Sequence, residues 1–249
     1  MLPIRFINLD RDAERRSRMQ AELGRLQLDG ERFPGVLWTA LPPNEQASLY
    51  SETLNARSFH KPLVNGEKGC YASHLALWQW LLQSSHAAVV VLEDDVRLKD
   101  DFAAVIDAIA ALPAGWEMIK LIGRAEIGKS EKLKDRQPLC PGFELVDYRR
   151  VPSLTAGYVL HRLGAEKLLA SRVPFGRPVD VDLRHWWEAA RLRIQGSAPA
   201  AIELDDTSLD SSIGAKVSER GIVSKWRKAQ HRLGYTLSNA WHDAPWRRR

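Results

Sequence analysis

The chain of 249 residues contains only two cysteines, Cys70 and Cys140, and no apolar run long enough to cross a membrane. Two cysteines cannot form a metal-binding cluster by themselves, and they fit a reducing compartment better than a disulfide scaffold. A transmembrane helix needs about 20 mostly apolar residues, so we expect no membrane span. We also expect no secretory signal peptide, because the strand-like residues 4–9 begin almost at once. These absences predict a cytoplasmic protein.

The charge balance is only mildly basic, with 36 Lys and Arg against 31 Asp and Glu, a net charge of +5. This excess favours an anionic partner such as a nucleotide, a phospholipid or a nucleic acid, without choosing among them. Much of the excess lies near the C-terminus, so it does not describe the core. The hydrophobic content of 45% is that of an ordinary globular protein with one sizeable core.

Strand-like and helix-like segments alternate along the chain, which predicts α/β layers joined by right-handed crossovers. Two polar stretches, 42–68 and 124–142, are predicted to be long loops with little regular structure. No internal repeat is present. We expect strands near 4–9, 33–41, 89–92, 116–122, 143–148 and 156–160, and helices after Asp10 and near 70–83, 102–112 and 164–171.

An apolar run at 88–92 is followed at once by three carboxylates, Glu93, Asp94 and Asp95. The run predicts a buried, parallel strand, and open α/β sheets bind ligands at the carboxyl ends of their strands. Three adjacent acids repel one another unless a cation or a solvated turn relieves them. The segment therefore indicates either a divalent-metal site that holds a polyphosphate or a solvated acidic turn.

A second acidic pair, Asp180 and Asp182, follows Pro178. In an extended chain these two carboxylates would point the same way, because residues two apart share a face. One of them could be a general base or a further metal ligand. The alternative is that they cap a helix that follows.

The segment 66–74 reads as a glycine-flanked turn that enters a helix, and such a turn can present backbone donors to an anion. Ser73 and His74 would then lie in the opening turns of that helix, where His74 could donate to a phosphate or a sugar hydroxyl. Arg11, Arg15 and Arg16 follow the first strand and could meet a diphosphate, or they could form a solvated helix face.

The composition changes from about residue 217, where cations alternate with aromatic rings. Such a segment suits an anionic membrane surface, and it could also stack on nucleic-acid bases or form a solvated helix. We expect a domain over 1–215 and a basic tail over 216–249 that touches the inner membrane face. The residues concerned are Arg220, Lys225, Trp226, Arg227, Lys228, Arg232, Tyr235, Trp241, Trp246 and Arg247–Arg249.

These motifs, in this order, resemble glycosyltransferase family 25, the lipopolysaccharide and lipooligosaccharide glycosyltransferases, which include bacterial galactosyltransferases and relatives of collagen galactosyltransferases. The resemblance covers about residues 4–213. The matching motifs are Ile7-Asn8-Leu9-Asp10-Arg11, Glu14-Arg15, Gly66-Glu67, Gly69-Cys70, Ser73-His74, Leu92-Glu93-Asp94-Asp95-Val96, Ile119-Lys120-Leu121, Tyr158, Gly164–Leu169 and Pro178-Val179-Asp180.

The resemblance implies a GT-A-like, Rossmann-type fold with a mixed, mostly parallel sheet flanked by helices, and an inverting, metal-dependent transfer. It assigns Mn²⁺ or Mg²⁺ to Glu93 and Asp95, and the catalytic role to Asp180 with Asp182 beside it. The third metal ligand is unassigned, since the match near Glu203 and 211–213 is loose. The nucleotide-sugar would be bound by Asn8, Arg11, Arg15, Ser73, His74, Glu93 and Asp94.

We therefore predict an enzyme that moves a hexose, with galactose as the first choice, from a UDP-sugar to a lipopolysaccharide-type acceptor, lipid-linked or oligosaccharide. Two alternatives stay open: a metal-dependent nucleotidyltransferase, which would release pyrophosphate, and a non-enzymatic nucleic-acid-binding module. The second rests only on charge and the tail. Because the basic residues form no recognition motif, we expect no nucleic-acid partner.

Overall fold

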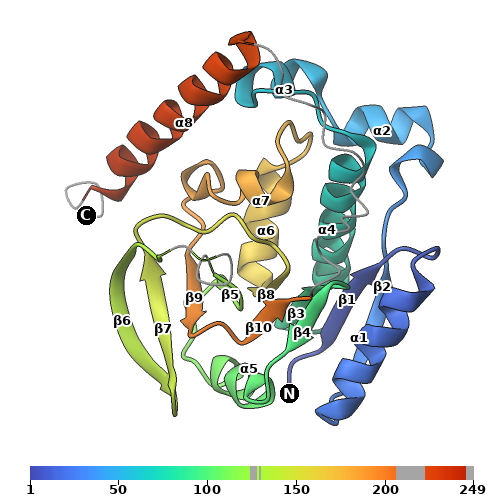
Figure 1. The fold of residues 1–249 in the computed structure, drawn as a ribbon, viewed down its shortest axis with the longest axis vertical. Helices are drawn as coiled ribbons and strands as arrows, with labels where there is room; N and C mark the ends of the chain where they lie inside the picture. Colours follow the sequence, from blue (N-terminus) through green and yellow to red (C-terminus); the bar gives the residue numbers. More distant parts are fainter. Residues whose placement is uncertain (124–127, 129, 206–221, 245–249) are drawn as a thin grey trace.

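The computed structural model describes residues 1–123, 128, 130–205 and 222–244. Its centre is an eight-stranded sheet in the order β2-β1-β3-β8-β5-β9-β7-β6, with a two-stranded ribbon of β10 and β4 beside it (Figure 1). The strands are β1 (Ile4–Asn8), β2 (Gly30–Pro34), β3 (Ala88–Glu93), β4 (Val96–Leu98), β5 (Met118–Lys120), β6 (Leu133–Cys140), β7 (Phe143–Tyr148), β8 (Gly157–His161), β9 (Ile194–Ala198) and β10 (Ile202–Leu204).

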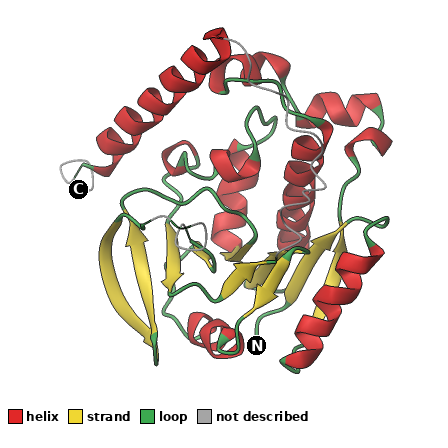
Figure 2. Cartoon of the chain, in the orientation of Figure 1, coloured by secondary structure: helices red, strands yellow, loops and turns green. Residues whose placement is uncertain are grey.

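The sheet is mixed. β1 runs parallel to β2 and β3, and β5 runs parallel to β9, whereas β8 is antiparallel to both its neighbours and β6–β7 is an antiparallel hairpin at the edge. Helices flank this sheet, as Figure 2 shows by secondary structure. The expected α/β class with a mixed sheet is confirmed.

Alternate side chains of β3 enter two separate cores, one on each face of the sheet. Val89 and Val91 belong to the cluster under α4 (Asn65–Gln83) and α6 (Arg162–Ser171). Val90 and Leu92 belong to the cluster under α1 (Ala13–Arg25) and α5 (Phe102–Ala110). Because side chains alternate across a strand, a wholly apolar run is what a strand covered on both faces requires.

The prediction of a loop over 42–68 is wrong. This stretch contains α2 (Pro43–Leu49) and α3 (Glu52–Ser58), and α4 begins at Asn65, five residues before the predicted start. Each helix start has a local cause: a proline occupies the first turn of α2, and Ser51 Oγ accepts a hydrogen bond from the amide of Leu54 at the start of α3. Glu67 accepts from the amide of Val64 at the start of α4.

The predicted loop over 124–142 is also corrected, because 133–140 form β6. Residues 124–127 and 129 lie outside the described residues. Pro138 did not prevent the strand, since β6 is the sheet edge and pairs with β7 alone. An edge strand has one side of its backbone without ladder partners, so a missing amide proton is tolerated there.

Two further helices follow in the C-terminal part of the chain: the short α7 (Val179–Asp182) and the long α8 (Ile222–Asp243). α8 begins beside α3 and runs toward the β6–β7 hairpin (Figure 1). Tyr235 and Asn239 are buried on its inner face, and Asn239 Nδ2 donates to the carbonyl of Arg149. The predicted tail residues Arg220, Trp246 and Arg247–Arg249 lie outside the described residues. No described helix is long and apolar enough to span a bilayer.

Gly69 allows α4 to lie against the segment that follows β2. A Cβ atom at this position would come within 2.6 Å of the carbonyl oxygen of Val36, a backbone atom that cannot rotate away. Ser73, one turn later, accepts a hydrogen bond from the amide of Val36 at 2.8 Å. Close packing therefore requires a glycine at position 69. The whole 66–74 motif lies within α4, and not in a turn before the helix as predicted.

We predict that Gly69→Ala destabilises the protein by about 1–3 kcal/mol, because the new methyl group overpacks against backbone. Gly24→Ala is the matched control: Gly24 is also helical, and a Cβ atom added there would meet nothing within 4 Å. That change should stabilise by about 0.5–1 kcal/mol. Urea unfolding measures both, and equal midpoints for the two variants would contradict the packing role of Gly69.

Candidate functional site

A cavity of about 420 Å³ opens where β1 and β3 end and α4 begins. Its walls come from the end of β1, the first turn of α1, the segment 35–39, the first turns of α4 and the acidic run after β3. The residues assigned from the sequence to the nucleotide-sugar and the metal all line this one cavity: Asn8, Arg11, Arg15, Ser73, His74, Glu93, Asp94 and Asp95.

Glu93 is the last residue of β3, and Asp94 and Asp95 form the turn into β4. The three carboxylates differ in environment. Asp94 accepts hydrogen bonds from Asn8 Nδ2 at 2.6 Å and from Arg15 at 3.2 Å. Asp95 has no comparable partner: its Oδ2 lies 3.7 Å from Arg15, and its buried Oδ1 has no hydrogen bond within the described residues. Burial and the charge of Glu93 raise the pKa of Asp95 to about 7.

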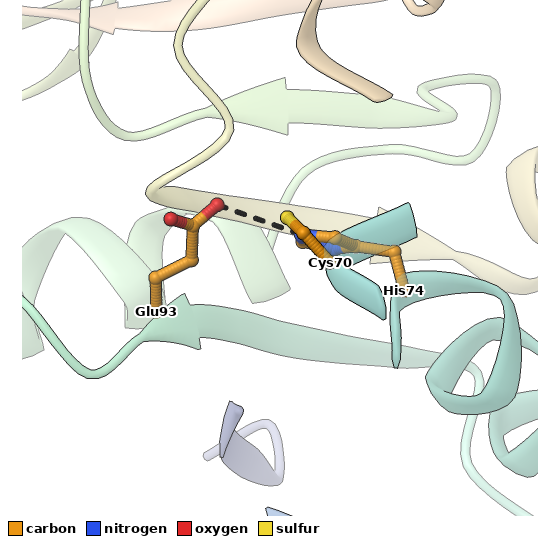
Figure 3. A group of neighbouring side chains, drawn as sticks. All are labelled: Cys70, His74 and Glu93. Atoms are coloured by element: carbon orange, nitrogen blue, oxygen red, sulfur yellow. Dashed lines mark ion pairs between the residues drawn. The ribbon is translucent and has the colours of Figure 1, made fainter. Parts of the chain in front are cut away.

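Glu93 contacts two side chains, Thr155 and His74, that do not contact Asp94. Thr155 Oγ1 donates to Glu93 Oε1 at 2.9 Å. His74 Nε2 lies 3.5 Å from the same oxygen, as Figure 3 shows. Burial alone would raise the pKa of Glu93, but the contacts with His74 and Thr155 and the charge of Lys120 outweigh it and lower the pKa. Glu93 is therefore an anion at neutral pH.

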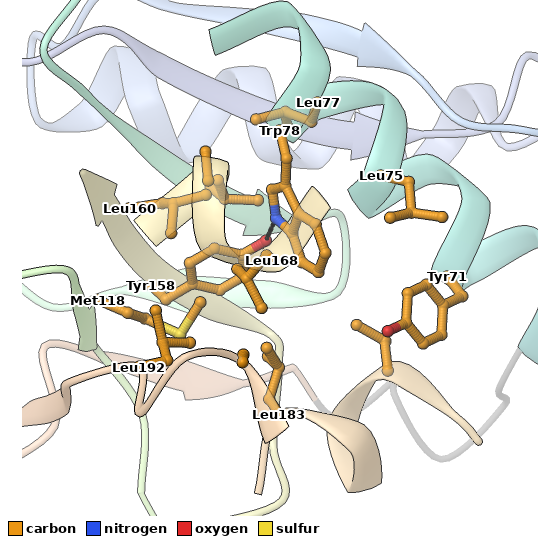
Figure 4. Packing of buried hydrophobic residues seen from close by; sticks show 14 of the residues in the cluster. Tyr71, Leu75, Leu77, Trp78, Met118, Tyr158, Leu160, Leu168, Leu183 and Leu192 are labelled. Atoms are coloured by element: carbon orange, nitrogen blue, oxygen red, sulfur yellow. Dashed lines mark hydrogen bonds between the residues drawn. The ribbon is translucent and has the colours of Figure 1, made fainter. Parts of the chain in front are cut away.

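A buried chain of hydrogen bonds sets the orientation of His74. Trp78 Nε1 donates to the Tyr158 hydroxyl at 2.8 Å (Figure 4), and that hydroxyl lies 2.8 Å from His74 Nδ1. If Tyr158 donates to Nδ1, the imidazole proton of the neutral ring is on Nε2, where it faces Glu93. The other tautomer would turn a lone pair toward the carboxylate, so we assign the first.

These groups fit a divalent cation that prefers oxygen ligands. The orphaned Asp95 Oδ1 and the ionised Glu93 present carboxylate oxygens to the same cavity, and a cation would relieve their repulsion. Cys70 Sγ also lies within 4.8 Å of ligand atoms of His74 and Glu93. Burial and nearby carboxylates raise the pKa of the Cys70 thiol well above its ordinary value, so a thiolate is disfavoured. Glu93 and Asp95 therefore suit Mg²⁺ or Mn²⁺ better than a thiolate-bound metal.

Asp180 does not line the cavity, but its charge interacts with Glu93 and with Cys70, which do. Burial raises the pKa of Asp180 to about 6. The attraction of Lys120 opposes that rise. A carboxyl with this pKa is largely ionised at pH 7 and still basic enough to take a proton, which suits a general base.

Lys120 is a site residue to which the sequence reasoning assigned no role. It is 1% exposed, and its Nζ donates to the carbonyl of Pro152 at 3.0 Å. Burial lowers the pKa of Lys120 to about 8, although Asp180 favours its charged form. The available signal was a lysine inside the apolar run 118–122, since a buried charge needs a partner.

Asp182 lies in a different network from Asp180. Tyr71 Oη donates to Asp182 Oδ2 at 2.5 Å, and Arg177 donates to Oδ1 at 2.8 Å. Arg172 lies 3.5 Å from the same carboxylate. The expectation that the pair points one way in an extended chain is wrong, because 179–182 are helical and residues two apart on a helix do not share a face.

Two residues that were predicted to bind the nucleotide-sugar, Ser73 and Arg11, differ in how far they are free to do so. Ser73 is buried in the third turn of α4, where its hydroxyl donates to the carbonyl of Gly69 and accepts from Val36. Arg11 is 57% exposed at the mouth of the cavity, with its Nε 3.8 Å from Asp12. Arg11 can therefore reach an anion in the cavity, whereas the Ser73 hydroxyl already serves the packing of α4.

Residues 1–183 match the family described as "Glycosyltransferase family 25 (LPS biosynthesis protein)". The chain belongs to glycosyltransferase family 25. The matched region contains the whole cavity, Lys120 and the Asp180 segment. β9, β10 and α8 lie beyond it.

This chain matches only part of the length of its family 25 relatives. A "Glycosyltransferase 25 family member" of Aedes aegypti is 32% identical over 186 residues, 72% of this chain and 29% of the relative. Human "Procollagen galactosyltransferase 2" is 30% identical over 184 residues, 71% of this chain and 28% of the relative. Mouse "Inactive glycosyltransferase 25 family member 3" is 31% identical over 184 residues, 71% of this chain and 30% of the relative. The chain thus spans about three tenths of these relatives.

We predict that Asp95→Asn removes the stabilisation that Mn²⁺ gives the folded protein. A cation present at about 100 times its dissociation constant stabilises by about 2.7 kcal/mol, so the melting temperature of the unaltered chain should rise with Mn²⁺ and that of the variant should not. Asp107→Asn, on α5 and outside the cavity, is the control and should keep the full shift. An undiminished shift in Asp95→Asn would contradict the metal assignment.

The same variant has a predicted pH signature without metal. The pKa of Asp95 is about 7 in the folded state, above its ordinary 3.8, so its protonated form is favoured by folding. That contribution to stability is present at low pH and is lost as pH rises through 7. Melting temperatures should therefore show Asp95→Asn gaining stability relative to the unaltered chain between pH 5 and pH 8. A constant difference would contradict the raised pKa.

Proposed function

We propose that the chain is an inverting, metal-dependent glycosyltransferase that uses a nucleotide-sugar donor. The observation that carries the proposal is the common cavity, where two arginines that follow β1 and three carboxylates at the end of β3 converge at the carboxyl ends of parallel strands. This is the place where open α/β sheets bind nucleotides. Family membership favours glycosyl transfer over the nucleotidyltransferase alternative.

In this proposal Glu93 and Asp95 hold Mn²⁺ or Mg²⁺, and Arg11 and Arg15 face the diphosphate of the donor. When bound, the cation would supply charge stabilisation to the leaving nucleoside diphosphate. Asn8 and Arg15 fix Asp94 in place, and His74 does the same for Glu93. These contacts hold the carboxylates ready for a cation at little cost in conformational entropy.

Asp180 is proposed as the general base that takes the proton of the acceptor hydroxyl. Its charge is close enough to that of Glu93 for the two carboxylates to perturb each other, and Lys120 favours its ionised state. An inverting transfer needs one such base on the side opposite the leaving group. Asp182, already bonded to Tyr71 and Arg177, is proposed to support the segment that carries Asp180.

The donor sugar is proposed to be a hexose carried by UDP, with galactose the first choice, and the acceptor a lipopolysaccharide-type glycan. The name of the human relative contains "galactosyltransferase", and the family description contains "LPS biosynthesis protein". A panel of UDP-sugars, each with and without Mn²⁺, tests the donor through the rise in melting temperature that a bound ligand produces.

We predict that Asp180→Asn lowers turnover about 10²–10⁴-fold while leaving UDP-sugar binding nearly unchanged, since only the proton acceptor is lost. In the unaltered enzyme, kcat/KM for the acceptor should fall below pH 6, where Asp180 becomes protonated, and level off above it. Asp182→Asn should instead lower the melting temperature. A variant Asp180→Asn with near-normal turnover would place the base elsewhere, with Glu203 tested next.

We further propose that α8 holds the enzyme at an anionic membrane surface. Its outer face exposes Trp226, Leu233, Leu237 and Trp241 by 51–64%, at spacings that place them on one side of the helix. The buried Tyr235 and Asn239 lie on the opposite side. A helix with exposed tryptophan and leucine, in a segment rich in lysine and arginine, has the composition of an interfacial anchor.

We predict that Trp226→Ser combined with Leu237→Ser weakens binding to phosphatidylserine vesicles about tenfold or more, because two apolar side chains no longer enter the lipid. Leu163→Ser, an exposed leucine on α6, is the control. Binding should also weaken with salt. Co-sedimentation measures the bound fraction, and equal binding by both variants, or none by the unaltered chain, would rule out the anchor.

A further inference from the structure

A second cavity, of about 360 Å³, lies under α8. It is separate from the cavity that contains the acidic run, which we call the donor cavity because the nucleotide-sugar donor is proposed to bind there. Its walls are the segment 58–60 after α3, the segment 150–153, the stretch after Asp180 and the inner face of α8. None of the described residues that line it is an Asp or a Glu. Four lining residues carry permanent positive charge: Arg150, Arg184, Lys228 and Arg232.

Two of these cations form no ion pair among the described residues. Arg150 and Arg184 both lie against the ring of Tyr235, with Cζ 4.9 Å and 4.2 Å from its centroid, and neither forms an ion pair there. Arg150 donates to Thr236, but the buried Nε of Arg184 has no hydrogen-bond acceptor among the described residues. Ring contacts attract a guanidinium but satisfy none of its N–H groups, so the cavity retains unused donors.

Two histidines that line this cavity have lowered pKa values, mainly because they are buried. Burial and the charge of Arg177 lower the pKa of His185 to about 4. Burial and the charges of Arg227 and His60 lower the pKa of His231. These two imidazoles are therefore neutral at pH 7. The positive charge of the cavity comes from its arginines and its lysine, and such a site favours an anion.

The cavity also adjoins the proposed base. Val181, the residue after Asp180, lines it, and so does Pro152, whose carbonyl holds Lys120. Arg184 acts electrostatically on Asp180. Asp180 therefore interacts electrostatically with Glu93 of the first cavity and with Arg184 of the second.

We propose that this second cavity binds the acceptor, and that it recognises an anionic group on it, a phosphate or a carboxylate attached to a sugar. That the bound molecule is an acceptor rests on the proposed glycosyl transfer, whereas the anion site itself does not. Arg150 and Arg184 would supply paired N–H donors to the anion. Lys228 and Arg232 would add charge from α8. The sugar hydroxyl beside the anion would then face Asp180.

Binding of sugar probes to the full chain tests this directly by calorimetry. The probes are mannose 6-phosphate, glucuronate and neutral methyl glucoside, which separate phosphate, carboxylate and uncharged sugar. We expect at least one anionic probe to bind and the neutral sugar not to bind. Arg184→Gln should weaken the anionic probe about tenfold or more, Arg184→Lys should weaken it less, and Arg136→Gln, on β6, should leave it unchanged. Equal binding of neutral and anionic sugars would overturn the proposal.

Two measurements separate this proposal from the donor site. UDP with Mn²⁺ should raise the melting temperature equally in Arg184→Gln and in the unaltered chain, and saturating UDP should not displace the anionic probe. Displacement by UDP would overturn the proposal, because the anion would then occupy the donor cavity. The exposed Arg232→Gln provides a second variant that does not depend on Arg184 for folding, and unchanged binding in both variants would also overturn it.

Discussion

Repulsion among three consecutive carboxylates is the constraint around which the donor cavity is organised. Glu93 ends β3, which is buried on both faces, and Asp94 and Asp95 form the short turn into β4, so three neighbouring acids lie at one strand end. Two of the three have partners in the protein: Asp94 accepts hydrogen bonds from Asn8 and Arg15, and Glu93 has Thr155 as a donor and His74 beside it. Asp95 has no hydrogen-bond donor on its buried Oδ1 among the described residues, and burial together with the charge of Glu93 raises its pKa to about 7.

The support for these carboxylates comes from residues that are distant in sequence. His74 is aimed at Glu93 by Tyr158 on β8 and by Trp78 on the same helix, within a core of aromatic and leucine side chains (Figure 4). Removing this support would leave a buried imidazole free to rotate, and the carboxylate would lose a partner that favours its charged form. The hydrophobic core thus contributes to the electrostatics of the site as well as to stability.

The sequence predicted the features that depend on local pattern. The buried strand and its acidic end were predictable because a short, wholly apolar run bounded by acids is typical of a strand covered on both faces. The helices α2 and α3 were missed since their residues are polar and small, and their starts rely on single contacts such as Ser51 with Leu54. The roles of Asp180 and Asp182 could not be separated from sequence, because a single helical turn directs one to Lys120 and the other to Arg177.

Cavities are the part of the site that no local pattern describes. The arginine-lined cavity joins residues near 60, 150, 184 and 230, and the packing of α8 through its buried Tyr235 and Asn239 brings them together. α8 has two unlike faces: the inner one presents Lys228 and Arg232 to that cavity, while the outer one exposes tryptophan and leucine. A helix built in this way can place a lipid surface and an anion site on opposite sides of one element. An acceptor that carries both an anionic sugar and a lipid would meet these two faces together, with Asp180 beside the anion site.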